Sequence, residues 1–409
     1  MLQDEFLFDN NDGLGGYESG GYDENAIHPV DVNWTRQSKY TIPNNPQLLW
    51  KVSVDNAFVN ESIVHGSFVV DRDRNIIVSD CDNNILEPHF GRLMKIKTNG
   101  EIEELFRNNR QLKSPVIGKN GCIYITTTGA IKSKGHKLFS ILPDGNVKWE
   151  FDIDEEAYSK PVLDSDGNVY IYTYSDMGTL FSISLEGSLN WQRKFNSVNW
   201  YEPIITKEGL ILIGLNVHHT LCALNKKGET IWEKKLGQGL GEYPMYLKDD
   251  GTIYACLSSK LFALNKNGEV LWDYMPGEGY VASTPAVDNM ANLYLNLTGF
   301  EIASLNIAGK ERWRTVVKGA ANVPPIVGSC NKIYQESFMQ RYPQYVSWVE
   351  AFTKDGQKLW DFELNGTIVS SVLANNNLIY ILSNCHTYSK KGWKDKMNVK
   401  WEIHAIGDV

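Results

Sequence analysis

A short phrase recurs along the chain, and it constrains the fold more than any other feature. Four successive copies read LFSILPDGNVKWEF, LFSISLEGSLNWQRKF, LCALNKKGETIWEKKL and LFALNKNGEVLWDY. Each copy has an alternating apolar run, a Gly turn and a second run with a tryptophan, which predicts a β-hairpin. The tryptophans fall at positions 149, 191, 232, 272, 313 and 360, with spacings of 40 to 47 residues. This period is typical of a four-stranded β-propeller blade.

A second hairpin precedes each phrase, as in KPVLDSDGNVYIYTY and TPAVDNMANLYLNL, where two β-rich runs flank a turn of Asp, Asn or Gly. We name the four strands of a blade A to D in chain order. The A to C strands are expected near 62–98, 113–142, 160–186, 202–226, 243–267, 283–308, 322–353 and 367–407. The sequence therefore predicts eight blades of antiparallel strands.

The repeat region is incomplete at both ends. The C-terminal KWEIHAIGDV has no following Trp strand, and LLWKVSV around Trp50 has no A to C strands before it. We expect the two ends to pair and close the ring, because closure removes exposed sheet edges. The predicted fold is all-β: residues 36–409 form one eight-bladed propeller, closed by the N-terminal strand.

The tryptophans of the phrase occupy one structural position in successive blades, and Trp50 and Phe106 extend the series upstream. A ligand-stacking ladder is one interpretation of such a series. We favour the other, in which the rings are wedges between neighbouring blades, because each repeat buries its faces against adjacent repeats.

Charge argues against several classes of partner. The chain has 49 acidic and 40 basic residues, so it lacks the basic excess that nucleic acid binding requires. Residues 1–35 are Gly-rich, with eight acidic residues and no Lys or Arg, which predicts a flexible tail. The acidic start does not fit a secretory signal, and the longest uncharged run, 209–225, is too short to span a membrane. We expect a cytoplasmic monomer.

The sequence also lacks recognisable catalytic or metal motifs. The six cysteines are widely separated, without a CxxC pair. Asp164, Asp166 and Asn168 in DSDGN match the start of a calcium loop, but the later ligands are missing, so a hairpin turn is the better interpretation. His218 and His219 are adjacent and would point to opposite faces of a strand. No nucleophile elbow, phosphate-binding Gly loop or zinc-protease motif occurs, and we expect no catalytic residue and no metal.

The phrase, Leu-(Phe/Cys)-(Ala/Ser)-(Leu/Ile), then Asp/Asn-Gly, then Leu/Ile-Trp, resembles the repeat of pyrroloquinoline-quinone-type propellers. Quinoprotein alcohol dehydrogenases and the outer-membrane assembly lipoprotein share this repeat. The resemblance extends over about residues 45–409. WD40 repeats differ, since each copy would show a Gly-His and a Trp-Asp pair, whereas among the repeat tryptophans only Trp272 and Trp360 are followed by Asp.

For the enzymatic members, the resemblance implies a quinone held by a disulfide of adjacent cysteines, a stacking Trp, a calcium ion and a catalytic Asp. This chain has no adjacent cysteines. We therefore expect the non-enzymatic branch of the family, with no cofactor and, by the same resemblance, a bacterial source.

The B–C loops differ in length, and the long ones belong to blades 1, 2, 7 and 8. They read CDNNILEPHFGR, TTGAIKSKGHK, QESFMQRYPQYVS and NCHTYSKKGWKDKMNVK. Blade 8 neighbours blade 1, so the four loops should form one wall at the channel mouth, on the face that also carries the D–A connections. Function on a rigid scaffold usually resides in loops, so this wall is the predicted binding site.

The wall offers aromatic side chains and an arginine, which are typical anchors of protein interfaces. They are Phe90, Phe338, Arg341, Tyr342, Tyr345, Trp348, Tyr388 and Trp393. The D–A connections NSVNWYEP, GQGLGEYP and GEGYVASTP add Trp200, Tyr201, Glu202, Glu242, Tyr243 and Tyr280. Carboxylates beside aromatic rings suit peptides or sugars; a solvated rim is the plain alternative.

We interpret the chain as a non-catalytic scaffold for a protein or peptide partner. The alternatives are a propeller that binds carbohydrate or another small ligand, and a quinone-dependent dehydrogenase. The acidic tail contains the partly apolar segment DEFLFDN directly after Gln3. It has three interpretations: it docks on the Lys-rich blade 8 loop, it is a motif for a partner, or it only adds solubility. That loop carries Lys390, Lys391, Lys394, Lys396 and Lys400.

Overall fold

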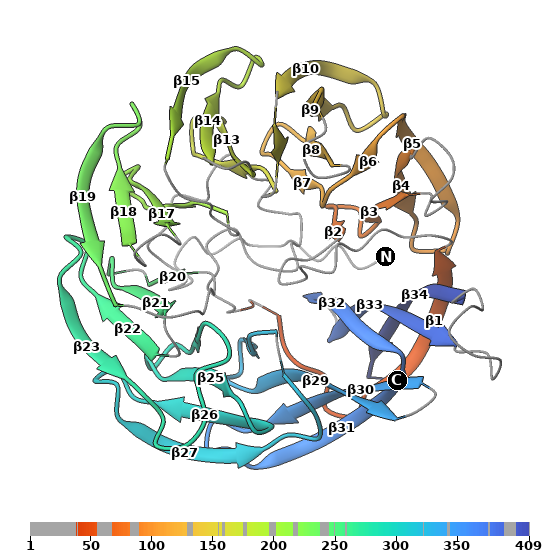
Figure 1. Ribbon diagram of the computed structural model, residues 1–409. Helices are drawn as coiled ribbons and strands as arrows, with labels where there is room; N and C mark the ends of the chain where they lie inside the picture. Colours follow the sequence, from red (N-terminus) through yellow and green to blue (C-terminus); the bar gives the residue numbers. More distant parts are fainter. Residues whose placement is uncertain are drawn as a thin grey trace, which may run out of the picture.

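The computed structural model describes residues 38, 40–54, 68–81, 90–128, 134–153, 155–157, 160–174, 178–195, 202–215, 220–237, 245–248, 250–257, 260–321, 323–341, 344–374, 377–387 and 398–408. All regular structure in these residues is β-strand. The strands form eight antiparallel sheets that surround a central axis (Figure 1). The predicted eight-bladed propeller is confirmed.

Five blades have the simple order A-B-C-D, with the short A strand innermost. Blade 1 contains β2 (Phe68–Val70), β3 (Ile76–Cys81), β4 (Gly91–Ile96) and β5 (Ile102–Asn108). Blade 4 contains β16 (Ile204–Ile205), β17 (Ile211–Leu215), β18 (Thr220–Leu224) and β19 (Thr230–Lys235). Blade 5 contains β20 (Tyr246–Leu247), β21 (Ile253–Leu257), β22 (Lys260–Leu264) and β23 (Val270–Tyr274). Blade 6 contains β24 (Ala286–Val287), β25 (Leu293–Leu297), β26 (Glu301–Leu305) and β27 (Glu311–Val316). Blade 7 contains β28 (Ile326–Val327), β29 (Ile333–Arg341), β30 (Gln344–Phe352) and β31 (Lys358–Asn365).

Blades 2 and 3 differ because a second short strand pairs with the B strand on its inner side. Blade 2 contains β6 (Gln111–Leu112), β7 (Val116–Ile117), β8 (Ile123–Thr128), β9 (His136–Ile141) and β10 (Val147–Ile153). Blade 3 contains β11 (Glu156–Ala157), β12 (Val162–Leu163), β13 (Val169–Tyr174), β14 (Thr179–Ile183) and β15 (Leu189–Lys194). Pro115 and Pro161 lie between the two short strands of each blade. Proline has no N–H to donate, which accounts for the interruption of the inner strand there.

Blade 8 joins the two ends of the repeat region, as expected. It contains β32 (Thr367–Ala374), β33 (Leu378–Thr387) and β34 (Asn398–Gly407), and its outer strand is β1 (Gln47–Val54). The register runs from Gln47 opposite Gly407 to Val54 opposite Trp401. The N-terminal strand therefore closes the ring.

The residues just before β1 also hold blades 7 and 8 together. The Trp360 indole N–H donates to the Pro43 carbonyl (2.8 Å), and the Ser329 amide donates to the Tyr40 carbonyl (3.0 Å). The Asp408 carboxylate accepts the amides of Asn44 (2.8 Å) and Asn45 (2.7 Å). In blades 2 to 6 the D-strand tryptophan reaches a C–D turn of the next blade, so residues 40–45 replace that turn in blade 8.

The repeat tryptophans are wedges between blades, as predicted. The Trp149 indole N–H donates to the Leu185 carbonyl of blade 3 (2.9 Å), and Trp232 donates to Lys266 of blade 5 (3.1 Å). Trp191, Trp272 and Trp313 make the same contact with Lys226, Ile307 and Lys354. The rings are half-buried rather than fully buried, because they lie at the outer rim of each interface.

Blade 1 departs from the pattern that had been extended to Phe106. In β5 of blade 1 the β-bulge lies between Glu104 and Phe106, the partners of Met94 and Leu93. In blade 2 the bulge lies between Val147 and Trp149. Phe106 consequently packs against the interface cluster, 5.1 Å from Phe139 between ring centroids, instead of covering a turn glycine. Gly145 lies in the C–D turn of blade 2, at the position that a tryptophan of blade 1 would cover. A Cβ at Gly145 would instead meet the Leu105 carbonyl.

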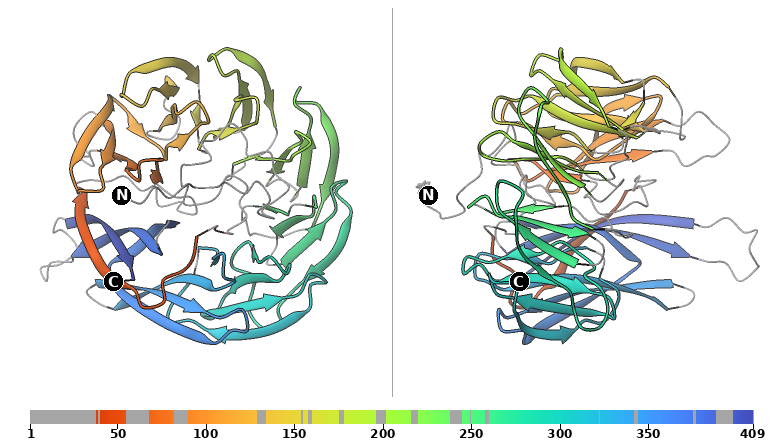
Figure 2. Two further views of the ribbon diagram at one scale, coloured as in Figure 1. Left: turned by 180° about the vertical axis from the view of Figure 1, so that it is seen from behind. Right: turned by 60° about the vertical axis from the view of Figure 1, so that its left-hand side comes forward.

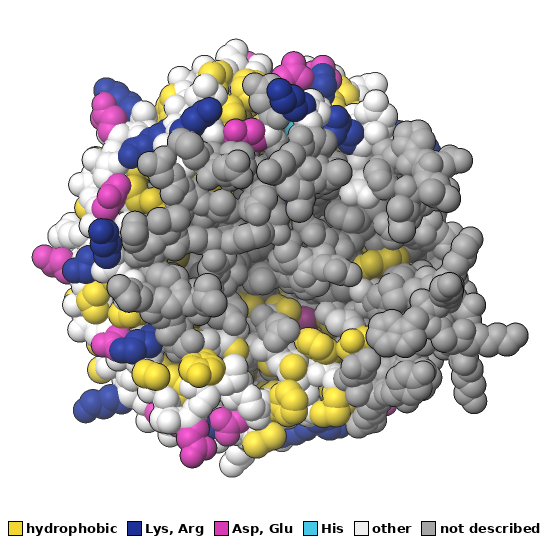
Figure 3. Space-filling view, viewed as in Figure 1, with side chains coloured by type: hydrophobic (Ala, Val, Ile, Leu, Met, Phe, Trp, Pro, Cys, Tyr) yellow, Lys and Arg dark blue, Asp and Glu magenta, His cyan; other side chains and the backbone are white. Residues whose placement is uncertain are grey.

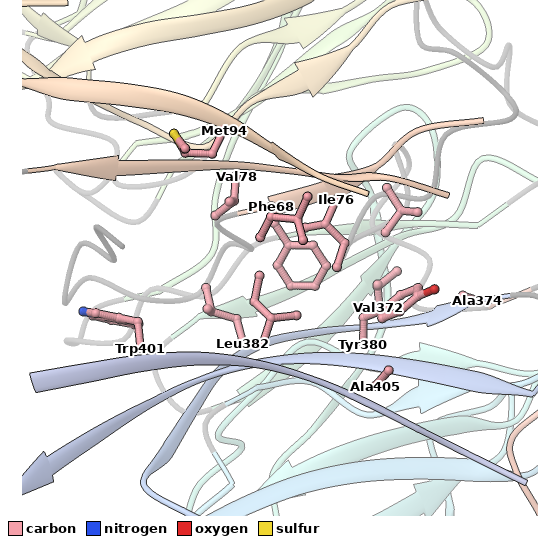
Figure 4. Packing of buried hydrophobic residues seen from close by; sticks show 13 residues of the cluster. Phe68, Ile76, Val78, Met94, Val372, Ala374, Tyr380, Leu382, Trp401 and Ala405 are labelled. Atoms are coloured by element: carbon pink, nitrogen blue, oxygen red, sulfur yellow. The ribbon is translucent and has the colours of Figure 1, made fainter. Parts of the chain in front are cut away.

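The apolar core is divided among the interfaces between blades. Eight buried clusters are found in the described residues, and each joins two adjacent blades. Figure 4 shows the cluster at the ring closure, where Phe68, Ile76 and Val78 of blade 1 face Tyr380 and Leu382 of blade 8. Burial of apolar area at these interfaces is the main stabilising term, as in other repeat proteins.

Candidate partner-binding face

The B–C turns and the D–A connections lie on one face of the ring, which we call the channel-mouth face. Figure 1 looks onto this face, and the right-hand view of Figure 2 shows two blue hairpins that project from it. They are β29–β30 of blade 7 and β33–β34 of blade 8, the longest B–C hairpins of the described chain.

The hairpins correct the expectation of long loops in blades 7 and 8. In blade 7 the strands continue until Arg341 faces Gln344, so the expected loop 335–347 is nearly all strand. In blade 8 the pairing extends to Thr387 opposite Asn398. Alternating residues such as Gln335, Ser337 and Met339 satisfy the period of a strand, and the added backbone pairing favours extension over a loop.

Many of the predicted site residues lie outside the described residues, so their role stays a prediction. They are Trp200, Tyr201, Glu242, Tyr243, Tyr342, Tyr388 and Trp393. Arg341 ends β29, but its side chain is likewise outside the description. His218, His219 and the acidic tail also fall in this category.

Trp348 is not on the surface of the wall. Its side chain is only 1% exposed, and its indole N–H donates to Glu363 (2.9 Å). The Lys318 ammonium lies 5.8 Å from the ring centroid, on the side of blade 6. The expected role as a partner anchor is therefore corrected: because residue 348 faces the blade 6 side of its strand, the indole packs within the ring.

Three other predicted wall residues are half-buried and contact neighbouring side chains. The Arg107 guanidinium lies 4.8 Å from the ring centroid of Phe90, within the range of a cation–π contact. The rings of Phe338 and Tyr345 face each other across the blade 7 hairpin, with centroids 6.4 Å apart. Each of these rings keeps part of its surface in solvent.

Glu202 lies in the interior of the ring rather than on its rim. It is 3% exposed and accepts a hydrogen bond from the Lys160 amide (3.2 Å). Burial raises the pKa of its carboxyl, while the charges of Lys160 and Lys113 act in the opposite direction. Glu202 therefore belongs to a charged group that links the D–A connections of blades 2, 3 and 4.

Tyr280 is exposed, and it belongs to an apolar surface that the sequence reasoning missed. We define the blade 6 shelf as Met275, Tyr280, Phe300 and Val316, whose exposed fractions are 56%, 56%, 43% and 67%. In Figure 3 hydrophobic side chains gather over the lower blades of this face. Loop length did not indicate the shelf, because Phe300 lies in the short turn 298–300.

Backbone hydrogen bonds bring the segments of the shelf together. The Thr298 amide donates to the Tyr280 carbonyl (2.9 Å), and the Tyr280 amide donates to the Thr298 hydroxyl (2.8 Å). The Val317 amide donates to the Phe300 carbonyl (2.8 Å). The D–A connection, the B–C turn and the end of β27 therefore form one continuous surface.

Phe300 has an unusual backbone for an aromatic residue. Its φ is 65°, directly after Gly299 at 93°, so two left-handed residues form the tip of the B–C turn. A side chain with a Cβ costs about 1 kcal/mol in this conformation, which glycine or asparagine adopts more readily. An exposed aromatic ring thus occupies a position where local backbone preference disfavours it.

Carboxylates border the shelf. Arg314 bridges Glu301 (3.2 Å) and Glu311 (2.9 Å), and Tyr274 donates to Glu311 (2.6 Å). The hydrogen bond from Arg314 is the largest cause that holds the pKa of Glu311 below its usual value. Glu278 lies exposed on the connection between Met275 and Tyr280.

The turn DSDGN is a hairpin turn, as predicted. Asp164 accepts the amides of Asp166 (3.0 Å) and Asn168 (2.8 Å), and its other oxygen accepts the Tyr170 hydroxyl (3.0 Å). The carboxylate is therefore used by the turn itself.

Within the described ranges, no group of three or more His, Cys, Asp or Glu side chains is placed to hold a metal ion. Nor does that part of the chain contain a helix with the length and apolarity to cross a membrane.

Closed blades, a Trp wedge at successive interfaces and a face of exposed turns define an eight-bladed β-propeller. The family model described as outer membrane protein assembly factor BamB matches residues 187–381, just under half of the chain. Residues 187–381 therefore resemble the pyrroloquinoline-quinone-type propeller repeat, in agreement with the resemblance seen in the sequence. No curated protein sequence matches the chain.

Solved propellers resemble the structure at low sequence identity. The C-terminal WD40 domain of Sif2 has a TM-score of 0.58 at 10% identity, covering 90% of this chain and 100% of that domain. The Dos1 propeller has a TM-score of 0.52 at 10% identity, covering 81% of this chain and 88% of that one. BamB from Moraxella catarrhalis has a TM-score of 0.44 at 13% identity, covering 68% and 92%. At such identities the likeness concerns the fold alone.

Proposed function

We propose that the protein is a scaffold that binds a protein or peptide partner on its channel-mouth face. The observation that carries the proposal is the blade 6 shelf, four large apolar side chains that are each at least 43% exposed. Contiguous exposed apolar surface on a soluble protein commonly marks an interaction site. The projecting hairpins of blades 7 and 8 would border the partner on the adjacent part of the face.

The conformation of Phe300 supports an interaction role. A left-handed backbone and solvent exposure of the ring both count against stability of the isolated chain. Transfer of the ring into an interface would offset the second of these costs. The matching family model is named for an assembly factor, which agrees with a protein that acts through other proteins.

The test replaces Phe300 by a photo-crosslinking phenylalanine analogue in the cells that produce the protein. Illumination should yield one dominant crosslinked partner, and Tyr280→Ala in the same chain should reduce its amount. The control carries the analogue at Met290, which is 66% exposed in an A–B turn on the opposite face. Equal adducts at positions 290 and 300, or none at position 300, would contradict the proposal.

A further inference from the structure

We infer that the blade 6 shelf binds a basic segment with apolar anchors, that is, a peptide in which Lys or Arg flanks large apolar side chains. The inference rests on the proposed scaffold function and adds the chemistry of the partner. Three features of the described residues lead to it: the composition of the shelf, its backbone pairing and its border of carboxylates.

The shelf offers side chains that suit insertion of apolar anchors. Tyr280 and Phe300 provide rigid aromatic surface, which is typical of interface hot spots. Met275 adds a flexible thioether that adapts to differently shaped partners. Val316 extends the surface to the end of β27, where it pairs with Glu301. A partner that covers these four residues removes their exposed apolar area from water.

The backbone of the shelf is already paired at the positions that join its segments. The amides of Tyr280, Thr298 and Val317 donate to partners within the chain. Addition of a partner strand to a free edge, the mode of many extended peptides, would need such groups to be available. At the joins between these segments recognition is therefore through side chains, so charge and apolar contacts decide binding there.

The border of the shelf carries more negative than positive charge. Glu278, Glu301 and Glu311 contribute three carboxylates, and Arg314 contributes one guanidinium that two of them share. The nearby Lys318 is paired with Asp361 at 2.5 Å. Glu278 makes no ion pair with any described residue and is exposed, so it can attract a cation from a partner.

The negative charge at the border of the shelf favours a basic partner segment over an acidic one. A basic segment gains attraction from the border, whereas an acidic segment meets like charges, which costs affinity and disfavours a wrong partner. The tail of this chain has eight acidic residues and no Lys or Arg among residues 1–35, so it is a poor occupant. The shelf of a second copy would bring the same carboxylates face to face.

The experiment is calorimetric titration of the full chain with three short synthetic peptides of equal length. The first alternates Lys with Phe and Leu, the second has Glu in place of Lys, and the third has Ser in place of Phe and Leu. The first should bind about ten-fold or more tightly than either of the others at low salt, because it alone supplies both kinds of contact.

Two variants locate the binding. Glu278→Lys should shift the preference toward the acidic peptide by about five-fold, the effect of an exposed charge pair. Tyr280→Ala with Phe300→Ala should weaken the first peptide by about ten-fold. The matched control Glu208→Lys reverses an exposed charge in an A–B turn on the opposite face and should change neither affinity.

Equal or tighter binding of the acidic or the apolar-free peptide would overturn the inference, as would no binding of the first peptide or an equal effect of Glu208→Lys. These outcomes are separate from failure of the scaffold proposal. If crosslinking at position 300 captures a partner through an acidic segment, the scaffold function stands and the inferred chemistry is wrong.

Discussion

The ring of Trp149 lies directly over Gly187 of the next blade, so close that a Cβ on Gly187 would come within 2.7 Å of it. Gly187 also has a φ of 84°, in the left-handed region. A single glycine thus meets two requirements, since it makes the C–D turn and leaves room for the tryptophan. The relation recurs in Gly228, Gly268, Gly309 and Gly356, each against the tryptophan of the preceding blade.

We expect Trp232→Ala to lower the free energy of unfolding by about 2–3 kcal/mol. Truncation of a fully buried aromatic costs about 3–5 kcal/mol, but this ring is half-buried, so the loss is smaller. The hydrogen bond to Lys266 is lost as well. Urea denaturation followed by fluorescence or circular dichroism measures the change. An unchanged urea midpoint in this variant would contradict the wedge assignment.

Gly268→Ala tests the space under the tryptophan. A Cβ at Gly268 would lie 2.7 Å from Trp232, whereas a Cβ at Gly100 would meet no atom within 4 Å. The two glycines have φ of 80° and 84°, so both substitutions carry about 1–2 kcal/mol of backbone strain. We expect Gly268→Ala to cost at least about 1 kcal/mol more than the control Gly100→Ala. Equal losses of stability in the two variants would show that the Trp232 ring moves aside without cost.

Glu202 predicts a pH dependence of stability. Burial raises the pKa of this carboxyl in the folded state. The folded protein then holds its proton to a higher pH than the unfolded chain, so stability falls as pH rises from the unfolded pKa through the folded one. We expect Glu202→Gln to flatten this fall, with greater thermal stability than the wild type at pH 7. A wild-type protein that gains stability relative to the variant across that range would contradict the assignment.

Asp408→Ala should weaken the ring closure. The carboxylate accepts the Asn44 and Asn45 amides, and these hydrogen bonds outweigh burial to lower the pKa of Asp408. Because its folded pKa is lowered, its contribution is present above the unfolded pKa and is lost as pH falls through the folded value. We expect a loss of about 1–2 kcal/mol at pH 7 that shrinks in acid. Hydrogen exchange of β1 should quicken in the variant, and unchanged exchange there would exclude the role.

The repeat made the fold predictable to the level of single strands. The six tryptophans, the turn residues and the unmatched ends were sufficient for the number of blades, their order and the closure by β1. Each of these depends on short-range pattern, because alternation and turn chemistry act within one hairpin. The different role of Phe106 was overlooked although its spacing differs, since it lies six residues after Gly100 whereas Trp149 lies four after Gly145.

The site was less predictable than the fold. Tyr280 lies on the exposed face as expected, yet Trp348 and Glu202, from segments of similar composition, are buried. Phe300 was missed because its turn is short. Whether an aromatic side chain anchors a partner or packs in the ring depends on which blade it faces, and that is a property of neighbours distant in sequence.

The amino-acid sequence by itself determined the repeat, the hairpins and the closed ring, because local alternation, turn residues and a wedge in each phrase all favour the same architecture. Only the tertiary structure decided which side chains remain in solvent, where the charges gather and how residues 40–45 stand in for the missing turn of blade 8. Those properties arise from contacts between blades, in which residues far apart along the chain lie together.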